Sequence, residues 1–223
     1  MYLSRIELRD ETARTPEFWK YSASMNDVHE VVWSWFADDP DRRRDFLYRH
    51  EGEGLSTRFY TLSARLPVDP GGLWRVESKP FAPKLSAGDR LIFSLRANPT
   101  RRKTDGPGKG KRHDVVMDAK FAARTSGGER KPFTELVETT CIDWLSSRAA
   151  ACGFGFAEGD VRTDGYRPVR FPRGRRHADA SVTTVDFEGR ITVKDPSCFL
   201  ESVTQGIGPA KAFGCGLMLI RRA

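Results

Sequence analysis

Four histidines are the side chains of this sequence best suited to proton transfer near neutral pH, because an unperturbed imidazole has a pKa of about 6.5. They are His29, His50, His113 and His177. His50 lies in a polar stretch, and His113 and His177 belong to basic segments, so we expect these three at the surface. His29 differs, because it falls within a stretch that has helical periodicity.

His29 lies near the edge of an apolar stripe formed by residues 28, 31, 32, 35 and 36, whose spacing predicts an amphipathic helix over 26–36. A side chain at that edge can be held in place and still reach a ligand. The first turns of a helix also disfavour imidazolium and attract anions. A single helical histidine is more often structural than catalytic, so the residue types alone leave its role open.

The cysteines do not indicate a metal site or a disulfide framework. Cys141, Cys152, Cys198 and Cys215 are scattered and show no CxxC pairing. Histidines, cysteines and carboxylates do not cluster at the spacing that metal ligands require. We therefore expect free thiols, no metal and no other cofactor.

Positive charge is concentrated in two segments. The chain has 37 lysines and arginines against 30 acidic residues, a net charge of +7. One basic segment carries Arg101, Arg102, Lys103, Lys109, Lys111 and Arg112, and the other carries Arg167, Arg170, Arg173, Arg175 and Arg176 beside Tyr166 and Phe171. Either segment could be a solvated loop, but two arginine-rich runs with aromatic neighbours indicate nucleic-acid binding.

A glycine-rich segment near the C-terminus is the third candidate for ligand binding. It spans 206–216 and includes Gly206, Gly208, Lys211 and Gly214. It follows an expected helix and lacks the Gly-Lys-Ser/Thr ending, so it is neither a dinucleotide fingerprint nor a nucleotide-hydrolase phosphate loop. Glycines still allow backbone N–H groups to approach phosphate closely, and Lys211 would add a point charge. A tight connection without a ligand is the alternative.

The periodicity predicts an α+β fold of two tandem ferredoxin-like (RRM-like, βαββαβ) domains, 1–88 and 89–223. In the first domain we expect strands at 2–8, 55–68 and 73–76 around the 26–36 helix. The second domain should contain helices at 133–150 and from Pro196 onward. Its strands are expected at 90–97, near Phe154, at 182–187 and 190–193 around a turn at Glu188-Gly189, and at 213–221, with a flexible loop after Pro99.

The sequence gives no reason to expect a membrane or secreted protein. No apolar run approaches the length that spans a bilayer, and the N-terminus alternates apolar and charged residues where a signal peptide would be apolar. We therefore expect a cytoplasmic protein.

Four motifs are spread along the sequence: Met1-Tyr2-Leu3-Ser4, Arg44-Asp45-Phe46-Leu47, Leu95-Arg96-Ala97-Asn98-Pro99 and the glycine-rich run GIGPAKAFGCGL at 206–217. They resemble motifs of the CasE family, the CRISPR-RNA endoribonucleases of type I-E systems, and occur in the same order as in that family. The resemblance extends over nearly the whole chain. The resemblance implies two ferredoxin-like domains, a CRISPR repeat stem-loop as substrate and the other subunits of the type I-E Cascade complex as partners. It also implies metal-independent cleavage, in which a ribose 2′-hydroxyl attacks the neighbouring phosphate.

The resemblance further implies roles for single residues. His29 matches the family's catalytic histidine, and the segment with Arg170, Arg173, Arg175 and Arg176 corresponds to a hairpin or loop that grips the RNA stem. Members of the family often carry a tyrosine one turn before the histidine, where this sequence has Asn26, while Tyr21 lies further upstream. Asn26 can bond phosphate but cannot perform the proton chemistry of a phenol.

Two alternatives to an endoribonuclease stay open. One is a non-catalytic subunit that binds the RNA hairpin inside a ribonucleoprotein, which the Asn26 departure keeps in consideration. The other is an RNA-recognition-motif protein of different function, although the aromatic strand signature of that class is missing.

Overall fold

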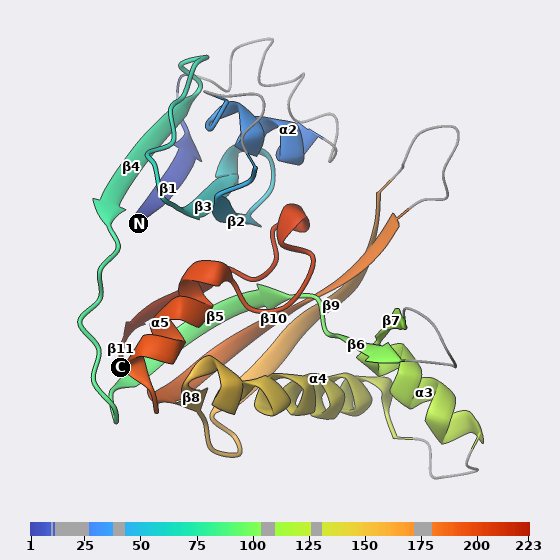
Figure 1. Ribbon diagram of the computed structural model, residues 1–223. Helices are drawn as coiled ribbons and strands as arrows, with labels where there is room; N and C mark the ends of the chain where they lie inside the picture. Colours follow the sequence, from blue (N-terminus) through green and yellow to red (C-terminus); the bar gives the residue numbers. More distant parts are fainter. Residues whose placement is uncertain (10, 12–26, 38–42, 104–109, 126–130, 172–179) are drawn as a thin grey trace.

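Two antiparallel sheets form the framework of the chain (Figure 1). The computed structural model describes residues 1–9, 11, 27–37, 43–103, 110–125, 131–171 and 180–223. The connection from β4, which ends at Pro80, to β5, which begins at Arg90, joins the two sheets. The predicted division between residues 88 and 89 falls within this connection.

The N-terminal sheet has the strand order β2-β3-β1-β4 and is covered on one face by a helix. Its strands are β1 (Tyr2–Leu8), β2 (Phe46–Glu51), β3 (Arg58–Ser63) and β4 (Trp74–Pro80), and the helix is α2 (Asp27–Ser34). The apolar residues of α2 and of the turn that follows it pack on aromatic residues of the sheet. Val32 of the helix and Trp35 of the turn are buried beside Phe46, Phe59 and Trp74. This packing fixes α2, and with it His29, over β2.

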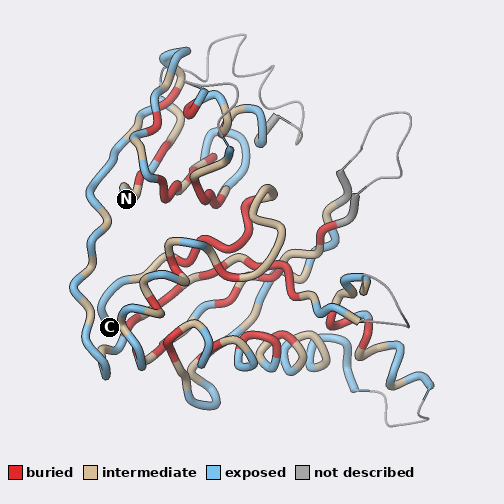
Figure 2. Tube along the Cα trace, in the orientation of Figure 1, coloured by how far each residue is buried: buried red, intermediate tan, exposed pale blue. Residues whose placement is uncertain are grey.

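The C-terminal sheet has the order β11-β5-β10-β8, with β9 also paired to β10. Its strands are β5 (Arg90–Ala97), β8 (Phe154–Gly155), β9 (Val161–Phe171), β10 (Ala180–Val193) and β11 (Met218–Arg222). The helices α4 (Phe133–Ala149) and α5 (Pro196–Gln205) supply residues to one core with alternate residues of β5 and β10. Figure 2 shows the buried residues along the inner strands and on one side of α4. Asp195 caps α5, since its Oδ1 accepts a hydrogen bond from the Cys198 backbone N–H at 3.0 Å.

Side chains of β5 alternate between its two faces, so this strand contacts both the core of the C-terminal half and the N-terminal sheet. Leu91, Phe93 and Leu95 are buried in the core of the C-terminal half, whereas Ser94 and Arg96 bond to β2 of the other sheet. The Leu-Arg-Ala-Asn-Pro motif therefore has a structural explanation. Its Arg96 reaches the His50 carbonyl at 2.7 Å, and its Asn98 amide donates to the Thr183 carbonyl at 2.6 Å.

Several expected element boundaries were wrong. The expected turn at Glu188-Gly189 does not form, because β10 continues through both residues. A Cβ at Gly189 would lie 2.0 Å from the Asp160 carbonyl oxygen, so this glycine permits close backbone packing within a strand. Strands β2 and β9 were not foreseen. The expected strand at 55–68 is reduced to Arg58–Ser63, and the last strand begins at Met218 after a 3₁₀ turn, η4 (Lys211–Phe213).

The segment after Pro99 is more ordered than its composition suggested. It forms the two-stranded sheet of β6 (Thr100–Lys103) and β7 (Lys111–Asp114), and then the helix α3 (Val115–Thr125), which sequence reasoning missed. Residues 104–109, which contain the Gly-Pro-Gly-Lys run, lie outside the described residues.

Candidate functional site

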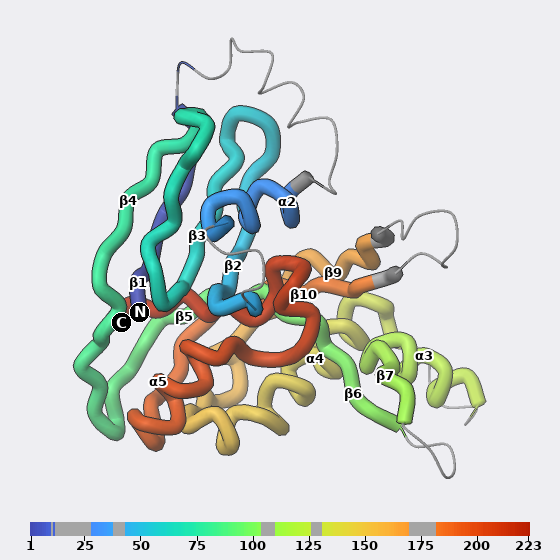
Figure 3. Tube along the Cα trace, turned by 45° about the horizontal axis from the view of Figure 1, so that its top comes forward, coloured from blue at the N-terminus to red at the C-terminus, as the bar shows by residue number. Residues whose placement is uncertain are grey.

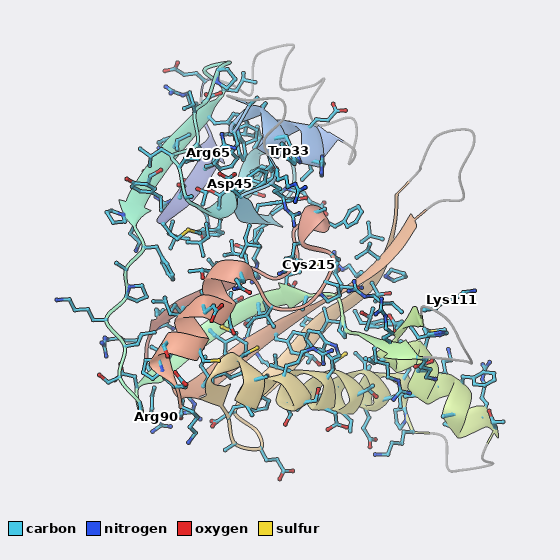
Figure 4. All side chains as sticks on the ribbon, in the orientation of Figure 1. Trp33, Asp45, Arg65, Arg90, Lys111 and Cys215 are labelled. Atoms are coloured by element: carbon cyan, nitrogen blue, oxygen red, sulfur yellow. The ribbon has the colours of Figure 1, made fainter. Side chains whose placement is uncertain are left out.

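His29 is an exposed residue of α2, held by its neighbour one turn away. The indole Nε1–H of Trp33 donates a hydrogen bond to His29 Nε2 at 3.0 Å, and the two ring centroids are 5.9 Å apart. Trp33, which Figure 4 labels, in turn packs edge-on against Phe46 of β2, with ring centroids 5.3 Å apart. The imidazole is therefore presented to solvent in a defined orientation.

The surroundings of His29 favour a neutral imidazole. Partial burial lowers its pKa from the ordinary value of 6.5, the positive charge of Arg44 lowers it further, and Glu30 opposes the shift. A neutral imidazole at pH 7 is the form that accepts a proton, so the residue suits general base catalysis.

His50 is not the surface residue that the sequence led us to expect. It lies on β2, and its ring stacks on Phe59 with centroids 4.6 Å apart. Burial, followed by the charge of Arg96, lowers its pKa to about 4. His50 is therefore neutral at pH 7 and belongs to the packing of the N-terminal sheet.

Arg44 is a candidate site residue that sequence reasoning did not identify. It lies two residues before β2, half-buried, and its charge lowers the pKa values of both His29 and Lys211. Its Nη1 is buried and has no hydrogen-bond partner within the described part of the chain. The only sequence signal for this position was its membership of the Arg44-Asp45-Phe46-Leu47 motif.

The glycine-rich segment forms a loop that touches both halves of the molecule. On the N-terminal side, the Tyr48 hydroxyl of β2 donates a hydrogen bond to the Ala212 carbonyl at 2.8 Å. On the C-terminal side, the Gly216 N–H donates a hydrogen bond to the Arg96 carbonyl of β5 at 2.7 Å. Figures 1 and 3 both place the η4 turn of this loop beside β2. The loop thus lies next to the strand that supports Trp33, so the α2 site and the glycine-rich loop are neighbours.

Three glycines of this loop have backbone conformations that disfavour a side chain. Gly208 has φ +83°, and a Cβ there would lie 3.1 Å from the Trp144 ring. Gly214 has φ +76°, and its Cβ would lie 3.2 Å from the Tyr48 ring. Gly206, at φ +82°, packs closely against Leu47. Gly208 and Gly214 therefore both have positive φ, and their close neighbours in the structure are aromatic rings.

Lys211 is partly engaged within the protein. Its Nζ donates a hydrogen bond to the Gln205 carbonyl at 2.6 Å, and burial, followed by the charge of Arg44, lowers its pKa. An ammonium group has three donors, so this contact leaves others for a ligand. The expected phosphate contact of Lys211 stays a prediction.

The first basic segment is partly neutralised. Arg101 and Lys103 bind Asp118 of α3 at 2.8 Å and 2.9 Å. Burial alone would raise the pKa of the Asp118 carboxyl, but the hydrogen bonds from Arg101 and Lys103 lower it below its usual range. Arg102 is exposed, and the described residues contain no ion pair to it. Arg101 and Lys103 therefore tie β6 to α3, and the predicted binding of RNA by Arg101, Arg102 and Lys103 stays a prediction.

The second basic segment belongs to the β9–β10 hairpin, whose two strands run from Val161 to Phe171 and from Ala180 to Val193. Arg170 is a β9 residue whose backbone lies opposite Ser181. The tip of the hairpin lies outside the described residues. So do these predicted site residues: Arg173, Arg175, Arg176, Asn26 and Tyr21.

Among the described residues, no group of three or more histidine, cysteine or acidic side chains could hold a metal ion. All four cysteines are free, and burial raises the pKa values of Cys141 and Cys215 to about 12. No helix in the described ranges has the length and apolar character needed to cross a membrane.

Comparisons with known proteins agree with this architecture. A family model described as "CRISPR associated protein" matches residues 1–222. The CRISPR system Cascade subunit CasE of Escherichia coli K12 is 29% identical over 221 residues, which are 98% of each chain. The CRISPR-associated endoribonuclease Cse3 of Thermus thermophilus is 33% identical over 161 residues, 69% of this chain and 65% of that protein.

Solved structures give the same result. Cas6e from E. coli K-12 superposes with a TM-score of 0.66 at 27% identity, covering all of both chains. T. thermophilus Cse3 bound to an RNA representing a pre-cleavage complex superposes with a TM-score of 0.70 at 26% identity, covering 99% of this chain and 98% of that one. The predicted α+β fold of tandem ferredoxin-like domains is confirmed. The chain therefore belongs to the family of CRISPR-associated proteins, as a CasE-family member.

Proposed function

We propose that this protein is a metal-independent endoribonuclease that binds the stem-loop of a CRISPR repeat and cleaves precursor CRISPR RNA. The observation that carries the proposal is the position of His29, whose pKa is lowered by burial and by Arg44, beside the glycine-rich loop. The names of the relatives, a Cascade subunit and an endoribonuclease, support the same function.

The reaction needs a base, an acid and positive charge near the phosphate. His29 takes the proton of the ribose 2′-hydroxyl, and the 2′-oxygen attacks the adjacent phosphorus. The bond to the 5′-oxygen breaks, and that oxygen takes up a proton. The products are a 2′,3′-cyclic phosphate and a 5′-hydroxyl. Histidine can perform both proton transfers near neutral pH, so the chain needs no metal for this chemistry.

RNA binding is proposed for two surfaces. The arginines of the β9–β10 hairpin bind the stem through phosphates and base edges, since guanidinium groups suit both. Gly206, Gly208, Lys211 and Gly214 of the glycine-rich loop bring backbone and charge to the cleavage end of the RNA. The product then stays bound, with this protein as one subunit of the type I-E effector complex in the cytoplasm.

A second candidate function is a non-catalytic hairpin-binding subunit of the same kind of complex. Two observations favour it. Asn26 stands where the family often has a tyrosine, and Trp33 occupies the Nε2 lone pair of His29 in this structure. A bound Nε2 cannot accept a proton until that hydrogen bond is exchanged.

The experiment that separates these functions is cleavage of a labelled repeat hairpin in the presence of EDTA. We expect a product that ends in a 2′,3′-cyclic phosphate, formed at the same rate with and without the chelator. Binding without cleavage would favour the second function. Cleavage that stops in EDTA and returns with a divalent ion would contradict the proposed mechanism.

A further inference from the structure

Half-buried Arg44 differs from three other arginines near it in the structure, because no counterion to it lies among the described residues. Three others each have a carboxylate partner: Arg49 with Glu51 at 2.7 Å, Arg65 with Asp45 at 3.0 Å, and Arg96 with Asp186 at 2.8 Å. Figure 4 labels the Arg65 and Asp45 pair in the N-terminal half of the molecule. Arg44 has no ion pair within the described ranges, and its Nη1 is buried without a hydrogen-bond partner.

An unpaired, partly buried guanidinium destabilises a folded protein, because removing a charge from water costs free energy that no partner returns. Burial lowers the pKa of Arg44 for the same reason, and among the described residues the group that opposes this shift is the Tyr48 hydroxyl. Such groups are retained where a ligand supplies the missing charge. The missing partner of Arg44 should therefore be an anion.

The residues that follow Arg44 on β2 contact both the α2 site and the glycine-rich loop. Phe46, two residues further along the chain, contacts Trp33 at 5.3 Å and stacks on Phe36 at 4.4 Å between ring centroids, which holds the start of β2 under α2. Tyr48, on the same strand, bonds to the loop at Ala212. Arg44 is near enough to both sides for its charge to act on His29 and on Lys211.

We propose that the Arg44 guanidinium binds the RNA phosphate at which cleavage occurs, opposite His29. This inference rests on the proposed endoribonuclease function and names the group that supplies positive charge to it. Attack by the 2′-oxygen places an additional negative charge on the non-bridging oxygens, and a guanidinium can donate two parallel hydrogen bonds to them. Because these bonds strengthen as the charge develops, Arg44 lowers the barrier more than it improves RNA binding.

The test is Arg44→Met, which keeps the aliphatic packing and removes the charge, beside Arg44→Lys and the exposed neighbour Arg43→Ala as a matched control. Arg44→Met should slow single-turnover cleavage of the repeat hairpin by about 100- to 1,000-fold, the usual effect of removing one donor to a developing oxyanion. Arg44→Lys should retain part of the rate, and Arg43→Ala should cleave like the parent. The melting temperature of Arg44→Met should stay the same or rise, which a stabilising structural arginine would not allow.

The pH profile gives a second readout. Among the described residues, the charged groups that act on His29 are Arg44 and Glu30. Removal of the Arg44 charge should therefore raise the pKa of His29 and move the rising limb of the rate profile to higher pH.

Parental cleavage by Arg44→Met, or a lower melting temperature with an unmoved pH profile, would overturn the inference. If the parent binds but does not cut, the endoribonuclease proposal fails by itself. Weaker hairpin binding by Arg44→Met than by Arg43→Ala would then still support a phosphate site, and equal binding would reject it.

Discussion

The indole N–H of Trp33 donates to Nε2 of His29 at 3.0 Å, so the side chain four residues along α2 determines which imidazole nitrogen is free. A neutral imidazole whose Nε2 accepts a hydrogen bond carries its proton on Nδ1. For His29 to act as a base through Nε2, the RNA must displace the indole. The hydrogen bond thus orients the imidazole of the free protein, and the proposed mechanism requires its exchange before catalysis.

Trp33→Phe should release this constraint while keeping an aromatic ring against Phe46. We expect ¹⁵N NMR of the free parent protein to show His29 mainly with its proton on Nδ1, and Trp33→Phe to show a larger share of the Nε2-protonated form. The melting temperature should change little, because the hydrogen bond is exposed. Identical imidazole spectra for the two proteins would contradict the assigned role of Trp33.

His29→Ala should abolish cleavage and leave hairpin affinity within a few-fold of the parent. A proton-transfer group typically contributes about 100- to 10,000-fold to the rate and little to ground-state binding. Single-turnover cleavage and a filter-binding titration on the same hairpin measure the two effects. Cleavage at the parental rate would remove His29 from the mechanism.

The cleavage rate of the parent should rise with pH through a limb that lies below pH 6.5. Burial and the charge of Arg44 lower the pKa of His29 from 6.5, and a general base is active only when neutral. The rate should therefore fall as the pH drops through the lowered pKa and be level near pH 7. A rising limb centred above pH 6.5 would indicate another base.

Replacing Arg173, Arg175 and Arg176 by alanine should weaken hairpin binding and flatten its salt dependence by about one unit of slope for each phosphate that is no longer bound. In the other basic segment, Arg102→Ala is the cleaner test, since Arg101 and Lys103 hold Asp118. Loss of either of those two should also lower the melting temperature. If the triple variant and Arg102→Ala both keep the parental affinity and salt slope, the RNA surface lies elsewhere.

Gly208→Ala and Gly214→Ala should lower stability and also impair RNA binding or cleavage. Each places a Cβ against an aromatic ring at positive φ, a conformation that costs about 1–2 kcal/mol for a residue with a side chain. Lys211→Ala removes charge without that strain, although it also removes the bond to the Gln205 carbonyl.

Melting temperature and affinity measured on all three loop variants separate the two roles of the loop. Parental affinity and cleavage per folded molecule in every variant, with reduced stability in the glycine variants, would make the loop a structural connection only.

Local sequence patterns predicted the strands and helices in which buried and exposed residues recur at a regular spacing. The alternation in 2–8 and 90–97 predicted β1 and β5, and the stripe from residue 28 to residue 36 predicted the helix that carries His29. Pro196 at the start of a helix likewise marked α5. In each case the signal is contained within one element, because one face is buried and the other is not.

Tertiary structure alone decided which distant residues meet. Strand β9 was missed because Gly165 and Pro168 interrupt it, and its pairing with β10 is set by residues about 10 to 30 positions away. Arg44 carries no local pattern of its own. Arg44 became a candidate for two reasons. Its Nη1 has no hydrogen-bond partner among the described residues, and β2, which follows it, contacts the glycine-rich loop. The resemblance to the CasE family could therefore propose His29 as a base from the sequence alone. The effect of the Arg44 charge on His29 became visible only in the packed structure, since electrostatic partners are fixed by distance in space.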